Sequence, residues 1–270
     1  MPCYHPISGF RSKDRNPSGK RSITFNKSEA FSDLPVELPC GQCIGCRLER
    51  SRQWATRCLH EASLYEENCF ITLTYNEECI PPFGSLRKED FTNFMKKLRR
   101  EYPGYKIRYF QCGEYGEICA ACGLPYIKHQ SAEHKYEPTL GRPHHHAILF
   151  GFNFSDRVRW KGGDFPLDRS MMLEHIWQHG HSSVGEVTFE SAAYVARYVT
   201  KKITGPQAAD HYAVYDKDGT VLGFRIPEYI TMSRRSGIGF EWFKKYSSET
   251  FRDDFVVVRG KKCRPPQVLL

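Results

Sequence analysis

A short segment that changes from polar to apolar restricts the fold of this 270-residue chain more than any other feature. Residues 141–151 are Gly-Arg-Pro-His-His-His-Ala-Ile-Leu-Phe-Gly, and the apolar half is typical of a strand rooted in a core. Side chains alternate between the faces of a strand, so His144 and His146 share one face and His145 lies on the other. Two imidazoles on one face can bind one divalent cation. The segment therefore predicts a core strand that carries metal ligands.

A two-histidine site needs a third protein ligand and open positions for substrate oxygens. We expect Glu114, which ends the preceding predicted strand in Cys-Gly-Glu-Tyr-Gly, to be that ligand, with Glu117 as the alternative. The competing interpretation is a weak surface metal patch made by adjacent histidines, with Glu114 a solvated carboxylate at a strand end.

Strands and helices are expected in the order β-α-β-β-α-β-α. The strands are expected at residues 70–75, 106–115, 144–151, 184–189 and 228–233, and the helices at 47–65, from a cap at Ser85 to Gly104, at 169–178, and from a cap at Ser191 to 203. This order predicts an α+β fold, an antiparallel sheet with helices on one side. We expect a basic, cysteine-rich N-terminal arm and helix at 1–66, a central domain at 67–245 with an insertion at about 116–140, and a basic C-terminal tail at 246–270.

Two tyrosines and two lysines follow the histidine segment. Tyr194, Tyr198 and Lys201 are spaced at i, i+4 and i+7, so they share one face of the predicted helix, and Lys202 lies next to them. A tyrosine hydroxyl, with a pKa of about 10, becomes a nucleophile toward phosphorus when a cation polarises the phosphate and nearby positive charge favours phenolate. The lysines would supply that charge and stabilise the transition state. The alternative is that both tyrosines only fill the core.

Cysteines are numerous for a chain without a predicted leader or membrane span. The chain has 11 cysteines, and its N-terminus lacks a basic region followed by an apolar stretch, so we expect a reducing compartment and free thiols or metal ligands. Cys40, Cys43 and Cys46, with Cys3 as the fourth thiol, predict a structural zinc site rather than an iron–sulfur cluster. A second candidate combines Cys119 and Cys122 with His129 or His134; buried free thiols are the alternative for both groups.

Basic residues on the first predicted helix suggest a polyanionic partner. The net charge is +8, which fits such a partner but also occurs in ordinary soluble enzymes. On the helix, arginines alternate with Trp54, a combination that can hold phosphates and stack a base. These arginines are Arg47, Arg50, Arg52 and Arg57. A solvated helical face is the alternative interpretation.

Taken together, these motifs resemble the replication initiators of the HUH endonuclease superfamily. The resemblance rests on the His-x-His strand, the downstream Tyr-x-x-x-Tyr-x-x-Lys, and residues 70–75, Phe-Ile-Thr-Leu-Thr-Tyr, which look like the family's first motif. It is greatest for the initiators of gokushoviruses, small single-stranded DNA phages of the microvirus group. Residues 39–47, 112–116 and 237–240 extend that likeness over most of residues 40–245.

The resemblance implies a ferredoxin-like HUH sheet with the histidines on a central strand, and Mg²⁺ or Mn²⁺ as the cofactor. It implies rolling-circle replication in a host bacterial cytoplasm, with covalent attachment of Tyr194 or Tyr198 to the 5′ end of a nicked strand. The free 3′-hydroxyl would prime the host polymerase, and the tyrosines would alternate to rejoin each genome. The implied partners are single-stranded and replicative-form viral DNA at the origin, host polymerase and host helicase, with no membrane.

Two other functions fit part of the sequence. A non-catalytic, zinc-stabilised DNA-binding or regulatory protein would explain the cysteines and the charge but not the histidine and tyrosine pairs. A plasmid relaxase or transposase of the same chemistry would share all these motifs.

Overall fold

The structure is a computed structural model that describes residues 3–116, 140–197, 202–203, 205–253 and 255–266. The chain forms two compact units, Met1–Arg52 and Gln53–Leu270, and the division falls inside helix α1 (Ile44–Ala62). The boundaries expected at residues 66 and 245 stay predictions.

The N-terminal unit contains a small antiparallel sheet in the order β2-β1-β3, followed by the first turns of α1. Its strands are β1 (Ile7–Arg15), β2 (Arg21–Thr24) and β3 (Val36–Leu38). The sequence predicted an N-terminal arm here, and these three strands were not predicted. Most side chains of β1 are exposed, so its pairing comes from backbone hydrogen bonds, which leave no hydrophobic alternation in the sequence.

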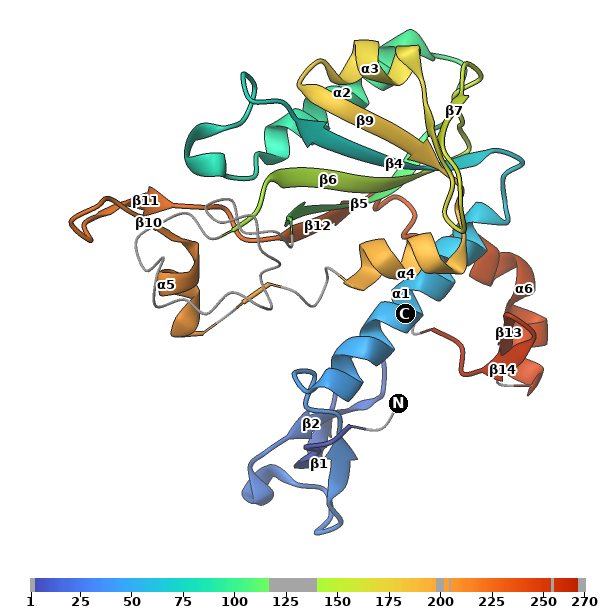
Figure 1. Ribbon diagram of the computed structural model, residues 1–270. Helices are drawn as coiled ribbons and strands as arrows, with labels where there is room; N and C mark the ends of the chain where they lie inside the picture. The colour runs from blue at the N-terminus through green and yellow to red at the C-terminus, as the bar shows by residue number, and fades with distance from the viewer. Residues whose placement is uncertain (1–2, 117–139, 198–201, 204, 254, 267–270) are drawn as a thin grey trace. The chain divides into compact units, whose positions relative to one another are not determined.

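The larger unit is built on a seven-stranded antiparallel sheet in the order β12-β5-β6-β4-β9-β8-β7 (Figure 1). These strands are β4 (Asn68–Tyr75), β5 (Arg108–Tyr115), β6 (Pro143–Phe150), β7 (Val158–Lys161), β8 (Leu167–Arg169), β9 (Gly180–Gly185) and β12 (Tyr229–Met232). The predicted α+β class and large antiparallel sheet are confirmed. The histidine strand β6 lies between β5 and β4, near the middle of the sheet, as expected.

Helices pack on both faces of this sheet, so the expectation of helices on one side was wrong. Helices α2 (Lys88–Glu101) and α3 (Met171–Trp177) cover one face, whereas α1 and α4 (Phe189–Arg197) cover the other (Figure 1). The central strands are apolar on both faces: Ile71 and Leu73 face α2 and α3, and Phe70 faces α4. Strands buried on both sides require a helical layer on each.

Helix α2 buries Phe91, Phe94, Met95 and Leu98, the spacing of one helical face. Acidic residues lie in its first turn and arginines in its last, which complements the helix dipole. The predicted cap at Ser85 was wrong, because the N-cap is Arg87 and Ser85 follows a separate 3₁₀ turn at Pro82–Gly84. The helix ends at Glu101, before Gly104.

Helix α4 begins with a reciprocal cap between Thr188 and Ser191. Thr188 Oγ1 accepts from the Ser191 amide at 3.1 Å, and Ser191 Oγ accepts from the Thr188 amide at 2.8 Å. The prediction of Ser191 as the N-cap was therefore wrong by three residues. The predicted end at residue 203 was also wrong, because Lys202 and Ile203 lie outside any helix.

Strand β9 ends at Gly185, so the strand expected at 184–189 was misplaced. Val187 and Phe189 pack in the core on the α4 side, which explains why that segment looked like a buried strand. The helix expected at 169–178 is α3, capped by Ser170, whose Oγ accepts from the Leu173 amide at 3.0 Å.

The sequence did not predict β1–β3, β7 and β8, and several further elements were also not predicted. They are α5 (Gln207–Tyr212), β10 (Ala213–Tyr215), β11 (Val221–Phe224), α6 (Phe240–Asp253), β13 (Val256–Val258) and β14 (Lys261–Cys263). The strands among them form two small hairpins, β10–β11 and β13–β14. Short and partly exposed strands carry little periodic signal.

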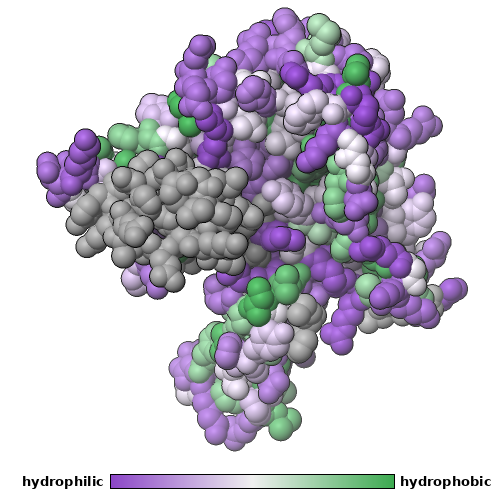
Figure 2. Space-filling view, in the orientation of Figure 1, coloured by the Kyte–Doolittle hydropathy of each residue, from purple (hydrophilic) through white to green (hydrophobic). Residues whose placement is uncertain are grey.

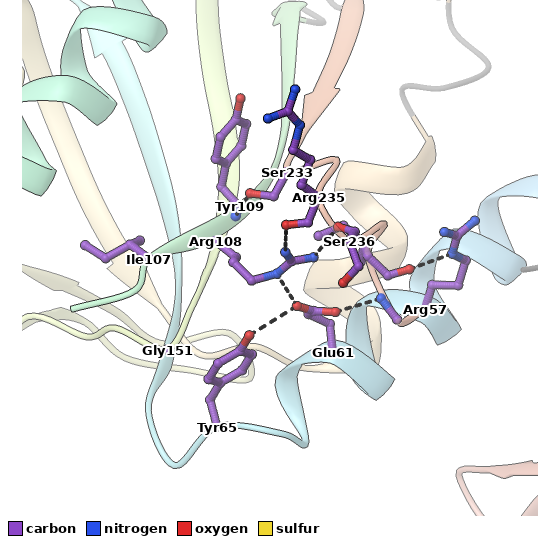
Figure 3. A network of polar contacts seen from close by, with 12 residues as sticks. Arg57, Glu61, Tyr65, Ile107, Arg108, Tyr109, Gly151, Ser233, Arg235 and Ser236 are labelled. Atoms are coloured by element: carbon purple, nitrogen blue, oxygen red, sulfur yellow. Dashed lines mark hydrogen bonds and ion pairs between the residues drawn. The ribbon is translucent and has the colours of Figure 1, made fainter. Parts of the chain in front are cut away.

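A buried ion pair joins α1, β5 and the loop before α6 (Figure 3). Arg108 Nε donates to Glu61 at 2.5 Å, and its terminal nitrogens donate to the carbonyl oxygens of Arg235 and Ser236 at 3.1 and 2.7 Å. The second Glu61 oxygen accepts from the Gly239 amide at 2.7 Å. Both charges in this cluster have partners, which offsets the cost of burying them.

Gly113 is the residue of β5 that directly precedes Glu114, and it pairs with Tyr229 on β12. A β-carbon at Gly113 would lie 2.7 Å from Cε1 and 2.8 Å from Cζ of the Tyr229 ring. The ring therefore occupies the space that any other side chain would need.

The visible surface is mainly hydrophilic in the view of Figure 2. Within the part of the chain that is described, no helix combines the length and apolar character needed to cross a membrane.

Candidate metal centre and active site

Three metal-ligating side chains converge from two adjacent strands. The register pairs Glu114 on β5 with His144 on β6, and Cys112 with His146, so all three candidates lie on one face of the sheet. Glu114 Oε1 lies 2.8 Å from Nε2 of His144 and 2.8 Å from Nε2 of His146. The structure brings together the three ligands expected from the sequence.

The outer ring nitrogens of both histidines are held by neighbours. His144 Nδ1 lies 3.0 Å from the carbonyl oxygen of Arg142, which can only accept, so Nδ1 is a donor and Nε2 faces Glu114. His146 Nδ1 contacts the Thr72 hydroxyl at 2.9 Å. Such outer contacts fix the ring orientation of metal-binding histidines.

These residues fit a divalent cation. A carboxylate oxygen and two imidazole nitrogens all face one point, and their ligand atoms lie within 4.8 Å of one another. Neighbouring ligands of an octahedral ion with bonds of about 2.1 Å lie about 3 Å apart, close to the observed 2.8 Å. Mixed oxygen and nitrogen ligands suit Mn²⁺ better than Mg²⁺, which prefers oxygen ligands and bound water.

Glu114 is buried, with 1% of its surface exposed. Burial alone would raise the pKa of its carboxyl, but hydrogen bonds from His144 and His146 outweigh that effect and the pKa is lowered. The carboxylate is thus kept charged inside the protein, as a metal ligand must be.

His145 lies on the opposite face, as the alternation requires. Its Nε2 lies 3.1 Å from the Tyr75 hydroxyl and its Nδ1 lies 3.2 Å from Nε2 of Gln111. Complete burial lowers the pKa of this imidazole to about 3. Tyr75 in turn donates to Asp90 at 2.8 Å. His145 therefore anchors β6 to the α2 side of the sheet.

Helix α4 places Tyr194 against the ligand cluster. The Tyr194 hydroxyl donates to Glu114 Oε1 at 3.2 Å. Its ring meets the ring of His146 edge to face, with centroids 5.0 Å apart. Tyr194 Oη thus lies at the carboxylate that both histidines share.

Most of the remaining candidates from the sequence lie outside the described residues. Tyr198 and Lys201 lie outside the described residues, and Lys202 is exposed. The second zinc candidate (Cys119, Cys122, His129, His134) and the alternative ligand Glu117 also fall outside the described residues.

Four cysteine thiols of the N-terminal unit form a second cluster. Cys3 Sγ lies 3.8 Å from Cys43 Sγ, and Cys40 Sγ lies 4.0 Å from Cys46 Sγ. Tetrahedral zinc with bonds of about 2.3 Å separates its sulfur ligands by about 3.8 Å. The spacing fits a zinc site with four cysteine ligands, and the four residues are those expected from the sequence.

Backbone amides stabilise charge on this cluster. The Tyr4 amide donates to Cys43 Sγ at 3.4 Å and is the main cause that lowers the pKa of Cys43 to about 6. The Cys43 amide does the same for Cys40, whose pKa is also lowered. Burial raises the pKa of Cys46 to about 12. Metal binding requires thiolates, and two of the four are favoured before any metal arrives.

The four candidate DNA-binding arginines differ in their surroundings. In the N-terminal unit, Arg50 is exposed, Arg47 is half-buried, and Arg52 pairs with Glu49 at 2.6 Å. In the larger unit, Arg57 is buried, and its Nε donates to the Ile238 carbonyl at 2.9 Å.

Trp54, the proposed stacking residue, is also packed. Its ring stacks on Phe110 at 5.3 Å, and the Arg57 guanidinium lies 4.2 Å from its centroid. Both side chains thus pack within the larger unit, and the DNA-binding role of the four arginines stays a prediction.

Thr72 is a site residue that sequence reasoning missed. The register pairs Thr72 with His146, which puts its hydroxyl beside the histidine ring. The alternation of residues 70–75 placed Thr72 and Thr74 on one face, but their neighbour across the sheet depends on pairing, which the sequence alone does not give.

Comparisons with known proteins relate this chain to replication proteins of phages. The family described as "Replication-associated protein ORF2/G2P" has a sequence model that matches residues 68–121 and 129–203. The first interval contains Glu114, and the second contains both histidines and both tyrosines. Replication-associated protein VP4 of Bdellovibrio phage phiMH2K is 28% identical over 276 residues, which cover 96% of this chain and 72% of that protein. The chain is a homologue of phage replication-associated proteins.

Two further relatives come from other phages of the microvirus and gokushovirus type. Replication-associated protein ORF2 of Spiroplasma virus 4 is 29% identical over 252 residues, 88% of this chain and 66% of that protein. Replication-associated protein ORF4 of Chlamydia phage 1 is 27% identical over 238 residues, 83% of this chain and 50% of that protein. The resemblance to replication proteins of gokushovirus-type phages is confirmed at the level of phage replication-associated proteins. No solved structure matches this chain.

Proposed function

We propose that this protein is a rolling-circle replication initiator of the HUH type that nicks and rejoins DNA at a viral origin through a 5′-phosphotyrosine. The observation that carries the proposal is the hydrogen bond from Tyr194 to Glu114, the carboxylate that both His144 and His146 contact. A tyrosine beside a metal-ligand cluster supports the chemistry, and the names of the phage relatives support the role in replication.

A bound Mg²⁺ or Mn²⁺ would polarise the scissile phosphate. Within the chain, Glu114, His144 and His146 would hold the ion, and the acceptor oxygen of Glu114 orients the phenol of Tyr194. Attack by the phenol oxygen forms a bond to phosphorus and breaks the bond from phosphorus to the 3′-oxygen. The phenol loses a proton, and the departing 3′-oxygen gains one.

The second tyrosine completes a cycle of cutting and rejoining. Tyr198 would attack the next junction while Tyr194 still carries DNA, or the reverse, with Lys201 and Lys202 supplying positive charge. The released 3′-hydroxyl would prime the host polymerase, with host helicase separating strands in the bacterial cytoplasm. We further propose that Zn²⁺ binds Cys3, Cys40, Cys43 and Cys46 as a structural ion.

The decisive experiment mixes the full chain with Mn²⁺ and single-stranded circular DNA that carries the origin of the encoding genome. A denaturing protein gel then detects covalent adducts. We expect a DNA-shifted band that disappears with a chelator or when both Tyr194→Phe and Tyr198→Phe are present. Tyr65→Phe is a matched control on the larger unit and should keep the band.

Retained DNA binding by the double tyrosine variant, without an adduct, would separate chemistry from binding. An adduct that forms without either tyrosine would refute the mechanism. Clean DNA binding with no adduct from the unmodified protein, across several origins and metals, would favour the non-catalytic zinc-stabilised DNA-binding protein. A relaxase or transposase would instead act on plasmid or transposon ends.

A further inference from the structure

The sheet face that holds the metal ligands continues beyond them as a polar surface. The register pairs Thr74 on β4 with His144 on one side and with His181 on β9 on the other. Glu114, His144, Thr74 and His181 therefore form one row across four neighbouring strands, on a single face. Figure 1 shows β6, β4 and β9 side by side.

This row becomes more exposed with distance from the ligands. Glu114 is buried, the His144 side chain is 16% exposed, Thr74 is half-buried, and His181 is exposed. The next row along the strands contains His146 and Thr72, and the row beyond it is apolar, with Phe70, Ile148 and Phe110 covered in the core. The end of the face near Thr74 and His181 thus offers hydroxyl and imidazole groups to a ligand that approaches the metal centre.

A positive charge lies at the same end of the face. Arg142 precedes His144 by two residues, and its carbonyl orients that histidine. Its guanidinium reaches β4, where NH1 donates to the Tyr75 carbonyl at 3.0 Å. The other terminal nitrogen pairs with Glu77, whose side chain is 81% exposed. Exposed ion pairs are weak, so a phosphate can replace Glu77 at little cost.

We propose that Arg142, Thr74 and His181 form a subsite that binds a backbone phosphate of the single strand about three nucleotides from the scissile phosphate. Strands β6 and β9 are separated by two spacings of about 4.8 Å, so His181 lies about 10 Å from His144. That distance is on the order of three stacked nucleotides at about 3.4 Å each. The subsite would fix the direction in which the strand enters the metal centre, as phosphate contacts do. This inference rests on the proposed nickase function.

The test uses the Tyr194→Phe, Tyr198→Phe background, which we expect to bind DNA without cutting it. Fluorescein-labelled oligo(dT) strands of increasing length are titrated in Mn²⁺, and anisotropy reports affinity. We expect His181→Ala and Arg142→Ala each to weaken binding about fivefold to tenfold. His175→Ala is the matched control, since His175 is an exposed histidine on α3, and it should bind normally.

Two readouts separate direct contact from general loss of structure. Arg142→Ala should reduce the slope of log affinity against log salt by about 0.7, the value for one phosphate on a single strand. As the oligo(dT) is lengthened, one added nucleotide should reach the subsite and increase the affinity of the background protein. The same added nucleotide should not increase the affinity of the His181→Ala variant. In the nicking protein, His181→Ala should raise KM and leave kcat nearly unchanged.

The subsite would be overturned if both variants kept the affinity, the salt slope and the length dependence of the background protein. A covalent adduct from the unmodified protein would still support the nickase function in that case. Weaker binding by both variants, in a protein that forms no adduct, would support the subsite and refute the nickase. Absence of DNA binding by the unmodified protein would overturn both.

Discussion

The histidine His60 should make the larger unit sensitive to mild acid. Its ring stacks on Trp242 of α6, with centroids 3.5 Å apart and planes within 8°. Burial lowers the pKa of His60 from 6.5 to about 4 in the folded protein. The unfolded chain therefore takes up a proton below about pH 6.5, whereas the folded protein does so only near pH 4.

The sign and size of the effect follow from linkage. Because the unfolded state binds more protons as the pH falls, stability decreases between about pH 6.5 and pH 4. A pH of 5 is about 1.5 units below the pKa of histidine in the unfolded chain. Each unit corresponds to about 1.36 kcal/mol, so the free energy of unfolding at pH 5 is lowered by about 2 kcal/mol. At pH 7 the contribution is near zero.

His60→Phe keeps an aromatic ring against Trp242 and removes the titrating group. Urea denaturation at pH 7 and pH 5, followed by far-UV circular dichroism, gives the free energy of unfolding of each protein. We expect the variant to lose about 2 kcal/mol less than the unmodified protein between these pH values. The control His175→Gln should follow the unmodified protein. Equal losses in His60→Phe and the unmodified protein would refute the assigned pKa and the burial behind it.

Two further predictions concern the cysteine cluster and the buried ion pair. In metal-stripped protein at pH 7, iodoacetamide should alkylate Cys43 before Cys46, because backbone amides lower the pKa of Cys43 to about 6 and burial raises that of Cys46 to about 12. Peptide mass spectrometry would detect this order, zinc should suppress it, and equal rates would contradict it. Arg108→Met should lower the free energy of unfolding by about 3–5 kcal/mol in urea, because Glu61 would stay buried without its partner. Arg108→Met with Glu61→Leu should restore part of the loss, and no restoration would argue against a charge effect.

The sequence was sufficient for the features that depend on alternation and spacing. The faces of His144, His145 and His146 follow from the two-residue period of one strand, and the grouping of Cys40, Cys43 and Cys46 follows from their spacing. The order of the central strands and helices along the chain followed from the periods of their hydrophobic residues. Each of these signals is local in the chain.

Features that depend on pairing between distant segments were not predictable in this way. The α4 layer on the second face, the Thr72 contact with His146 and the row that ends at His181 all require the strand order and register. The sheet in residues 7–38 was missed because the residues of its strands, apart from Gly9, are exposed or half-buried and show no clear hydrophobic alternation. Helix starts were misplaced because α2 begins after Arg87 without a side-chain capping hydrogen bond, and α4 begins at the cap formed by Thr188.

The close approach of Gly113 to the Tyr229 ring links two positions that are far apart in the sequence. Among related chains, a larger residue at the position of Gly113 should occur only where the position of Tyr229 has become small. The two positions should therefore covary, although neither faces the metal ligands. A mutational library should show the same dependence as epistasis: Gly113→Ala harmful alone and tolerated with Tyr229→Ala. Sequence change next to Glu114 is thus limited by the Tyr229 ring, which packs on the face of the sheet opposite the metal ligands.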